Sequence, residues 1–263
     1  MKSLAVHVLF VFILSASSAV ARIDYGANPS AFRLDLAEGI VDSSVVSALW
    51  QNPAGISRNT EGKVSGGLLS SSSSLSPFNY SLGYLTGNGS VGGALALGGS
   101  TGDSSTLNHV RLGLAAEFPS AKFSLGFTGA YSIDDRSTDG NLGLIFNPSG
   151  DLRVGAVAYQ VAGGPDTYGA GIAYDPSYSA TIAVDASADR RLKGLRLKPA
   201  LGVRAGDFHL TAGYGFSIED SSSSGSISKG FCAGVGYALD YKLFFAATLR
   251  QAEHYRFELT LRL

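Results

Sequence analysis

From residue 62 to its C-terminus, the sequence is a series of short stretches in which apolar residues alternate with polar or small ones. Residues that favour turns, chiefly glycine, proline, asparagine, aspartate and serine, separate these stretches. A period of two residues is typical of β-strands, because successive side chains point to opposite faces of a sheet. The pattern predicts fourteen strands, at about residues 62–70, 77–86, 91–99, 107–118, 121–131, 140–147, 151–160, 167–175, 178–186, 195–204, 207–216, 227–239, 241–250 and 254–263.

The connections between these stretches alternate in length. Short turns, such as residues 86–89 and 119–120, follow every second stretch, and the intervening connections, such as residues 217–226, are mostly longer and polar. Transmembrane β-barrels have this alternation, with short periplasmic turns and longer outer loops. We therefore predict an all-β fold, a fourteen-stranded antiparallel transmembrane β-barrel at residues 62–263, in preference to a soluble β-sandwich.

Aromatic residues gather at the ends of the predicted strands, as they do at the two interfaces of a bilayer. Those beside the short turns are Tyr84, Phe118, Phe123, Phe146, Tyr174, Tyr178, Phe208, Tyr237 and Tyr241. Those near the longer loops are Phe78, Tyr131, Tyr168, Phe216 and Tyr255. A soluble core would place its aromatic residues in the middle of strands, so this distribution favours the barrel.

The composition excludes several other classes of protein. Charged residues make up only 16% of the chain and there are 34 glycines, so the chain is too apolar for a disordered protein and too poor in charge for a coiled coil. A net charge of −1 gives no electrostatic basis for binding nucleic acid. The one cysteine, Cys232, cannot form an internal disulfide.

The first 21 residues have the pattern of a secretory signal peptide. Lys2 supplies the positive charge, residues 4–14 form an apolar run, and Ala19-Val20-Ala21 is a small-x-small cleavage site. The run is too short to cross about 30 Å of hydrocarbon as a helix, and no later segment approaches the length of a transmembrane helix. We expect cleavage after Ala21 and a location in the bacterial outer membrane.

The last predicted strand alternates between two kinds of side chain. Apolar residues at every second position suit lipid, and the residues between them, including Arg256 and Glu258, suit a wet lumen. The strand resembles the C-terminal signal that outer-membrane barrels present to their insertion machinery, although that signal usually ends in Phe or Trp. The residues of this predicted insertion signal are Tyr255, Phe257, Leu259, Leu261 and Leu263.

The same alternation assigns residues to the lumen. The basic residues placed there are Lys63, Arg111, Lys122, Arg196, Lys198, Arg204, Lys242, Arg250, Arg256 and Arg262, against the acidic residues Glu117, Asp185 and Glu258. A basic interior would favour anions. Alternatively, these side chains are simply hydrated at strand ends. The face of Arg153 stays undecided.

Most other predicted inward positions carry glycine or alanine, which lets another piece of chain approach the wall closely. They are Gly92, Ala94, Ala96, Gly98, Gly113, Ala115, Gly126, Ala130, Gly169, Gly171, Ala173, Gly213, Gly215, Gly234 and Gly236. The candidate for that piece is residues 22–61, which do not alternate. There, Asp42 would cap a short helix at residues 43–51, and Pro53 would end it.

The segment from Asp42 to Ile56 includes Trp50 and the turn Asn52-Pro53-Ala54-Gly55. It resembles the N-terminal signature of FadL-type outer-membrane barrels, a grouping that includes transporters of fatty acids and aromatic hydrocarbons and the PorV-like barrels of protein secretion. The resemblance implies that residues 22–61 form a hatch inside the lumen, with Trp50 against its wall. The predicted loops are much shorter than those of the transporters, and no apolar lumen patch for an acyl chain is evident.

The resemblance implies passive transport of a small, hydrophobic compound across the outer membrane. A second hypothesis is a PorV-like scaffolding barrel that docks exported proteins and transports nothing. The expected partners are outer-membrane lipid, the insertion machinery, and either a hydrophobic small molecule or an exported protein. His109, His209 and His254 lie in no metal-binding or nucleophile motif. We therefore expect no enzymatic activity, no cofactor and no metal.

Overall fold

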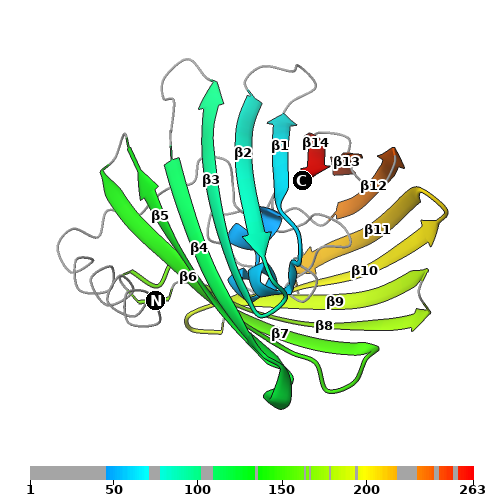
Figure 1. The fold of residues 1–263 in the computed structure, drawn as a ribbon, viewed down its shortest axis with the longest axis horizontal. Coiled ribbons are helices and arrows are strands. Elements are labelled where there is room, and N and C mark those ends of the chain that lie inside the picture. The colour runs from blue at the N-terminus through cyan, green and yellow to red at the C-terminus, as the bar shows by residue number, and fades with distance from the viewer. Residues whose placement is uncertain are drawn as a thin grey trace.

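The computed structural model describes residues 46–70, 78–101, 109–133, 136–162, 164–165, 167–177, 179–192, 195–217, 230–239, 243–250 and 254–263. Within these residues, fourteen strands form one closed barrel (Figure 1). The strands are β1 (Lys63–Ser70), β2 (Phe78–Gly87), β3 (Val91–Thr101), β4 (His109–Phe118), β5 (Phe123–Ser132), β6 (Ser137–Phe146), β7 (Leu152–Tyr159), β8 (Thr167–Ser177), β9 (Ala180–Asp189), β10 (Arg196–Ala205), β11 (Phe208–Ser217), β12 (Gly230–Leu239), β13 (Leu243–Arg250) and β14 (His254–Arg262).

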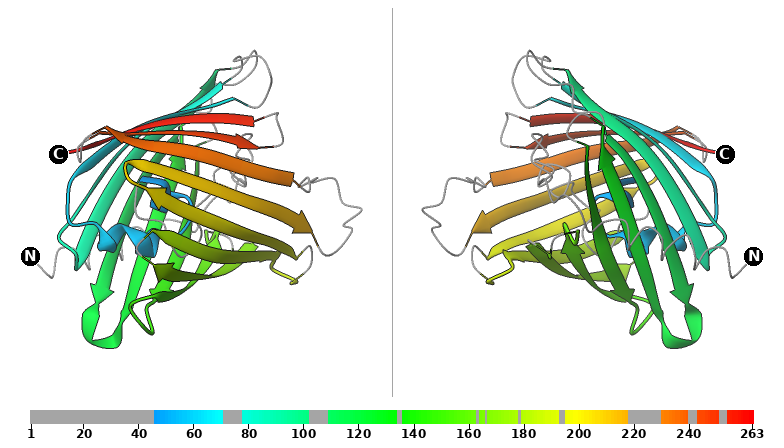
Figure 2. Two further views of the ribbon diagram at one scale, coloured as in Figure 1. Left: turned by 90° about the vertical axis from the view of Figure 1, so that its right-hand side faces the viewer. Right: turned by 90° about the vertical axis from the view of Figure 1, so that its left-hand side faces the viewer.

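Each strand pairs with its neighbours in the sequence, and β14 pairs with β1 to close the ring. The closing pair is antiparallel and runs from Lys63 opposite Arg262 to Ser70 opposite Tyr255. The side views show the strands strongly tilted around the barrel (Figure 2). The all-β antiparallel barrel predicted from the alternation is therefore confirmed.

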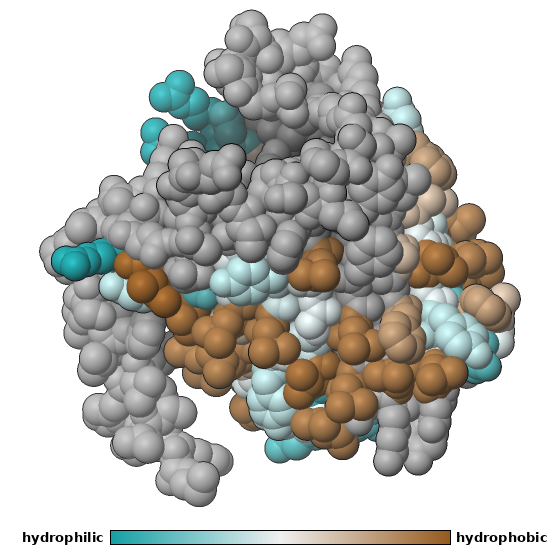
Figure 3. Space-filling model, turned by 90° about the horizontal axis from the view of Figure 1, so that it is seen from above, coloured by the Kyte–Doolittle hydropathy of each residue, from teal (hydrophilic) through white to brown (hydrophobic). Residues whose placement is uncertain are grey.

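The wall has two chemically different faces. On β4, Arg111, Gly113 and Ala115 are buried, whereas Leu112 and Leu114 between them are 47% and 49% exposed. The same alternation recurs on the neighbouring strands, where exposed side chains include Leu95, Leu125 and Leu142. Figure 3 shows many hydrophobic side chains next to one another on one outer face of the molecule. The apolar residues thus point outward and the small or polar ones inward.

Aromatic residues at the short-turn end of the wall pack against each other. The rings of Phe118 and Phe123 are stacked with their centroids 4.7 Å apart, and those of Phe208 and Tyr237 are tilted at 4.8 Å. Phe118, Phe208 and Tyr237 are exposed, so the aromatic side chains at this end of the barrel face outward. Tyr178 and Tyr241, assigned to the same end, lie outside the described residues.

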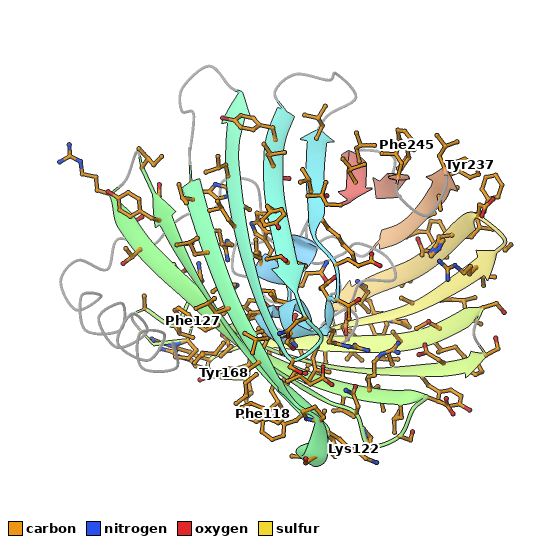
Figure 4. All side chains as sticks on the ribbon, viewed as in Figure 1. Phe118, Lys122, Phe127, Tyr168, Tyr237 and Phe245 are labelled. Atoms are coloured by element: carbon orange, nitrogen blue, oxygen red, sulfur yellow. The ribbon has the colours of Figure 1, made fainter. Side chains whose placement is uncertain are left out.

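The β4–β5 turn differs from the prediction. The 3₁₀ helix η3 (Pro119–Ala121) follows β4, and Lys122 then adopts a left-handed conformation with φ of 55° before β5 begins at Phe123. Lys122 therefore lies exposed at the tip of this turn and not in the lumen (Figure 4). Its Nζ donates a hydrogen bond to the carbonyl oxygen of Pro148 in the next short turn, 3.3 Å away.

Candidate functional site in the barrel lumen

The lumen contains the end of the N-terminal region, here called the inner segment (residues 46–59). It consists of two 3₁₀ helices, η1 (Val46–Leu49) and η2 (Pro53–Arg58), drawn in blue within the ring of strands (Figures 1 and 2). Pro53 was predicted to end a helix, but in the structure it begins η2. Proline suits the first helical position, because its φ is already helical and its missing N–H needs no partner there. Asp42 and residues 22–45 lie outside the described residues.

Asn52 fixes the start of η2 from within. Its side-chain oxygen accepts a hydrogen bond from the backbone N–H of Ala54 at 3.1 Å, which is the usual arrangement of an N-cap. Its Nδ2 donates to the carbonyl oxygen of Leu144 on β6 at 3.1 Å and faces that of Ala156 on β7 at 3.4 Å. One buried side chain thus shapes the turn and also ties it to the wall.

The inner segment is buried almost completely. Ala48, Leu49 and Ile56 are fully buried and form one cluster with Trp50 and with small wall residues of β3 and β4. A second cluster joins Ala54 to three wall residues from β6, β8 and β9, which are Ile145, Ala173 and Ala183. The segment therefore packs mainly against β1–β6 and reaches toward the opposite wall through Ala54.

Three wall glycines explain how the segment lies so close to the sheet. A Cβ atom at Gly92, Gly126 or Gly143 would lie less than 3.0 Å from Ile56, Pro53 or Asn52, respectively. Contacts that short essentially do not occur for real Cβ atoms, so a larger residue at these positions would push the segment off the wall. The glycine-rich inner face is thus shaped to hold this piece of backbone.

Two basic residues hold the inner segment by polar contacts. Arg111 is 2% exposed, and its Nη1 donates a hydrogen bond to the carbonyl oxygen of Leu49 at 3.1 Å. Its guanidinium also lies 5.6 Å from the centre of the Trp50 ring, within the range of a cation–π contact. Lys63 donates from Nζ to Oδ1 of Asn59 at 2.7 Å. These two side chains were predicted to line the lumen, and they bind the segment there.

The basic residues on the opposite wall contact acidic ones. Arg153, whose face the sequence left undecided, points inward and forms a two-point ion pair with Asp175, with Nη2 and Oδ1 3.0 Å apart. Thr181 donates to the same carboxylate at 2.7 Å. Lys198 Nζ lies 3.9 Å from Asp185 Oδ2. Arg153 and Lys198 thus each lie next to a carboxylate. A preference of the lumen for anions stays a prediction.

For several other predicted site residues, the structure describes the backbone but not the side chain. Arg196 begins β10, Arg250 ends β13 and Arg256 lies in β14, but their side chains are not among those described. The same holds for Tyr255 and Phe257 of the predicted insertion signal. Its other members, Leu259, Leu261 and Leu263, are exposed on the outer side of the closing strand pair.

Asp175, the partner of Arg153, is not among the lumen residues predicted from the sequence. It lies two residues beyond Ala173, the partner of Arg153 in the β7–β8 register. An opposite charge two positions along the neighbouring strand is within reach of a long side chain. The signal was present, but using it required the register of this hairpin.

Within the described part of the chain, no group of three or more His, Cys, Asp or Glu residues is placed to hold a metal ion. Among the same residues, none of the helices has the length and hydropathy needed to cross a membrane.

Comparisons with known proteins locate the chain by its fold. No protein-family model and no curated protein sequence matches it. Among solved structures, it is similar to a TodX monoaromatic hydrocarbon channel lacking S2 and S3, with a TM-score of 0.56, 10% identity and coverage of 81% of this chain and 92% of that one. A triple mutant of Rh. blastica porin gives a TM-score of 0.49 at 8% identity, over 77% of this chain and 99% of the porin. At such identities, the likeness to the hydrocarbon channel establishes a shared barrel fold.

Proposed function

We propose that this chain is a FadL-like outer-membrane β-barrel that passively transports a small hydrophobic compound, with residues 22–61 acting as its hatch. The observation that carries the proposal is the inner segment, which lies in the lumen and is held to the wall by a few identifiable contacts. A removable obstruction inside a barrel is the simplest element for controlling passage. The fold shared with a monoaromatic hydrocarbon channel supports an apolar solute.

The outer face supports a location in a bilayer. Large apolar side chains are about half exposed on strand after strand, as with Leu82 on β2, Leu142 on β6 and Leu210 on β11. Soluble monomers rarely expose contiguous apolar patches beyond a few hundred Å². A folded membrane barrel migrates differently on a gel before and after boiling. Identical migration of boiled and unboiled protein would refute this location.

Export and insertion belong to the same proposal. Residues 1–21 serve as a signal peptide cleaved after Ala21, and β14 presents the insertion signal to the assembly machinery. The intact mass of the protein purified from outer membranes tests cleavage directly, because a mature chain starts at Arg22. A mass that includes residues 1–21 would contradict it.

Transport is tested in liposomes. The wild-type protein is compared with a deletion of residues 42–56, and uptake of toluene, an uncharged hydrocarbon, is measured beside that of a sugar. The deletion removes the inner segment up to Ile56, so it should raise the uptake of both solutes. The wild type should admit the hydrocarbon above the level of protein-free liposomes. If neither protein changes permeability to any solute, while both migrate as folded barrels, the transport proposal fails.

One observation favours the second function, a PorV-like scaffolding barrel. The wall glycines fit the inner segment so closely that the segment resembles a permanent part of the core. A scaffold of this kind would show no uptake in either form. It would instead form specific cross-links to exported proteins in intact cells, and these cross-links would survive in the deletion variant. We propose no catalytic activity and no cofactor for either function.

A further inference from the structure

The outer wall contains a groove where the barrel closes. A cavity of about 530 Å³ is lined by Leu68 and Tyr80 on one side, Val235, Tyr237 and Phe245 on the other, and Leu259 between them. These residues belong to five consecutive strands in the order β2, β1, β14, β13 and β12. All six are among the exposed large hydrophobic residues, so the cavity lies on the outside of the barrel.

A cavity that spans five strands on the outside requires the wall to be indented there. The outer face of a regular barrel is convex, and neighbouring side chains diverge from it. Here Tyr80 of β2 and Tyr237 of β12 line the same cavity although three strands separate them. Figure 4 shows Tyr237 and Phe245 near each other at one edge of the barrel.

Small residues line the groove, and at one of them, Gly66, the surrounding packing leaves room for a larger side chain. Gly66 and Ala247 lie between the aromatic sides. A Cβ atom added at Gly66 would meet nothing nearer than Leu82 Cδ1 at 3.9 Å, an ordinary contact distance. This contrasts with Gly92 on the inner face, where a Cβ atom would collide with Ile56. The space over Gly66 is therefore left open to something outside the chain.

We propose that this groove binds one acyl chain of a membrane lipid. None of the residues that line it is charged, and apart from Ser81 and the two tyrosine hydroxyls the lining side chains are apolar, which suits a hydrocarbon chain. The volume lies within the roughly 300–1,000 Å³ of ordinary ligand sites. A second copy of the barrel cannot fill it through the same face, because two indented surfaces placed together enclose a void. A flexible hydrocarbon chain adapts to such a shape without this cost.

The affinity comes from packing and not from the hydrophobic effect. Lipid tails are as apolar as leucine, so transfer from the bilayer to the groove brings no gain in hydrophobic burial. The gain is in dispersion contacts with the rings of Tyr80, Tyr237 and Phe245, which a mobile neighbouring lipid does not supply. We therefore expect a lipid that exchanges more slowly than its neighbours, at a defined place on the wall. The inference rests on the proposed membrane location and not on transport.

The experiment uses two glycines of the outer face. Gly66→Leu fills the groove, whereas Gly93→Leu on β3 is the matched control, because a Cβ atom there also meets nothing nearer than 3.8 Å and lies outside the groove. Each barrel is reconstituted with phosphatidylcholine that carries a nitroxide on its acyl chain. Electron spin resonance then counts the motionally restricted lipids per barrel. We expect the count to fall by about one in Gly66→Leu and to stay at the wild-type value in Gly93→Leu.

A second pair of variants protects the test against a folding defect. Ala247→Phe fills the same groove from β13, and Ala170→Phe places the same residue on the exposed face of β8. The number of motionally restricted lipids is compared between the variants with a filled groove and their controls. If the numbers are equal while all variants migrate as folded barrels, the lipid proposal fails and the membrane location stands. Cross-linked dimers of an Ala247→Cys variant that also carries Cys232→Ala, abolished by Gly66→Leu, would overturn the lipid proposal in favour of a second copy. Absence of heat-modifiable migration would instead overturn the membrane location itself.

Discussion

Arg111 on β4 donates a hydrogen bond to the carbonyl oxygen of Leu49, 3.1 Å away, at the last residue of η1. Both residues are buried, and the same guanidinium lies over the ring of Trp50. Arg111 thus satisfies a carbonyl at the end of a short helix and packs against the residue that follows it. A buried charge on the inner face of the barrel thus fastens the inner segment to the wall.

Replacing Arg111 with methionine should loosen the inner segment. The variant keeps a long apolar side chain but loses a charge-assisted hydrogen bond, which costs about 1.5–3 kcal/mol. Trp50 is the only tryptophan of the chain, so its fluorescence reports on the segment alone. We expect a red-shifted emission and stronger quenching by acrylamide. Arg204→Met, which removes an exposed arginine that bonds His209, is the control and should leave both unchanged.

The same substitution should have an effect at Gly92 and none at Gly93, although the two glycines are adjacent on β3. Gly92 faces the inner segment and Gly93 faces outward, with Leu114 Cδ2 at 3.8 Å as its nearest prospective contact. Gly92→Val should expose Trp50 to acrylamide, because the new side chain collides with the backbone of Ile56. Gly93→Val should not. Equal quenching in the two variants would show that the wall does not hold the segment by close approach.

The two roles of Asn52 can be separated by two substitutions. Asn52→Ser retains an acceptor for the N–H of Ala54 but cannot reach Leu144, so it should cost about 1–2 kcal/mol. Asn52→Asp also retains the acceptor, yet it directs a carboxylate at the carbonyl oxygen of Leu144 in a fully buried site. Its cost should therefore be larger. The denaturant midpoint of the Trp50 fluorescence change gives the order, and an aspartate variant as stable as wild type would contradict it.

A charge placed on the outer face should destabilise the barrel according to depth. Leu142 lies near the middle of β6 and is 51% exposed, whereas Val91 begins β3 beside a short turn. In a bilayer, Leu142→Lys should cost about 2–4 kcal/mol, and Val91→Lys about 0–1 kcal/mol. Reversible unfolding from lipid vesicles measures both. Similar small effects at the two sites would indicate that water and not lipid surrounds the wall.

The alternation of side chains made most strands predictable, because each face of the wall has its own chemistry. The third strand was expected at residues 91–99 and occupies Val91–Thr101. The prediction was wrong where both faces are polar. The sixth strand begins at Ser137 and not at residue 140, because Ser137–Asp139 pair with β5 through their backbone although their side chains resemble a loop.

The candidate site was predictable in outline and not in its contacts. Small residues at inward positions indicated that chain packs against the wall, and Gly92 and Gly126 lie where it does. The ion pair of Arg153 with Asp175 depends on the register of a hairpin, which alternation alone does not determine. The sequence around Pro53 is compatible with two outcomes, because proline is common just after one helix and also at the first position of the next.

The position of the inner segment constrains the order of assembly. It precedes β1 in the chain and packs mainly against β1–β6, so it can dock while the sheet is still an open, curved ribbon. Pairing of β14 with β1 then completes the ring around it. Were the ring completed first, the bulky Trp50 would have to thread into a finished cylinder. The strand that completes the wall is thus also the one that encloses the inner segment.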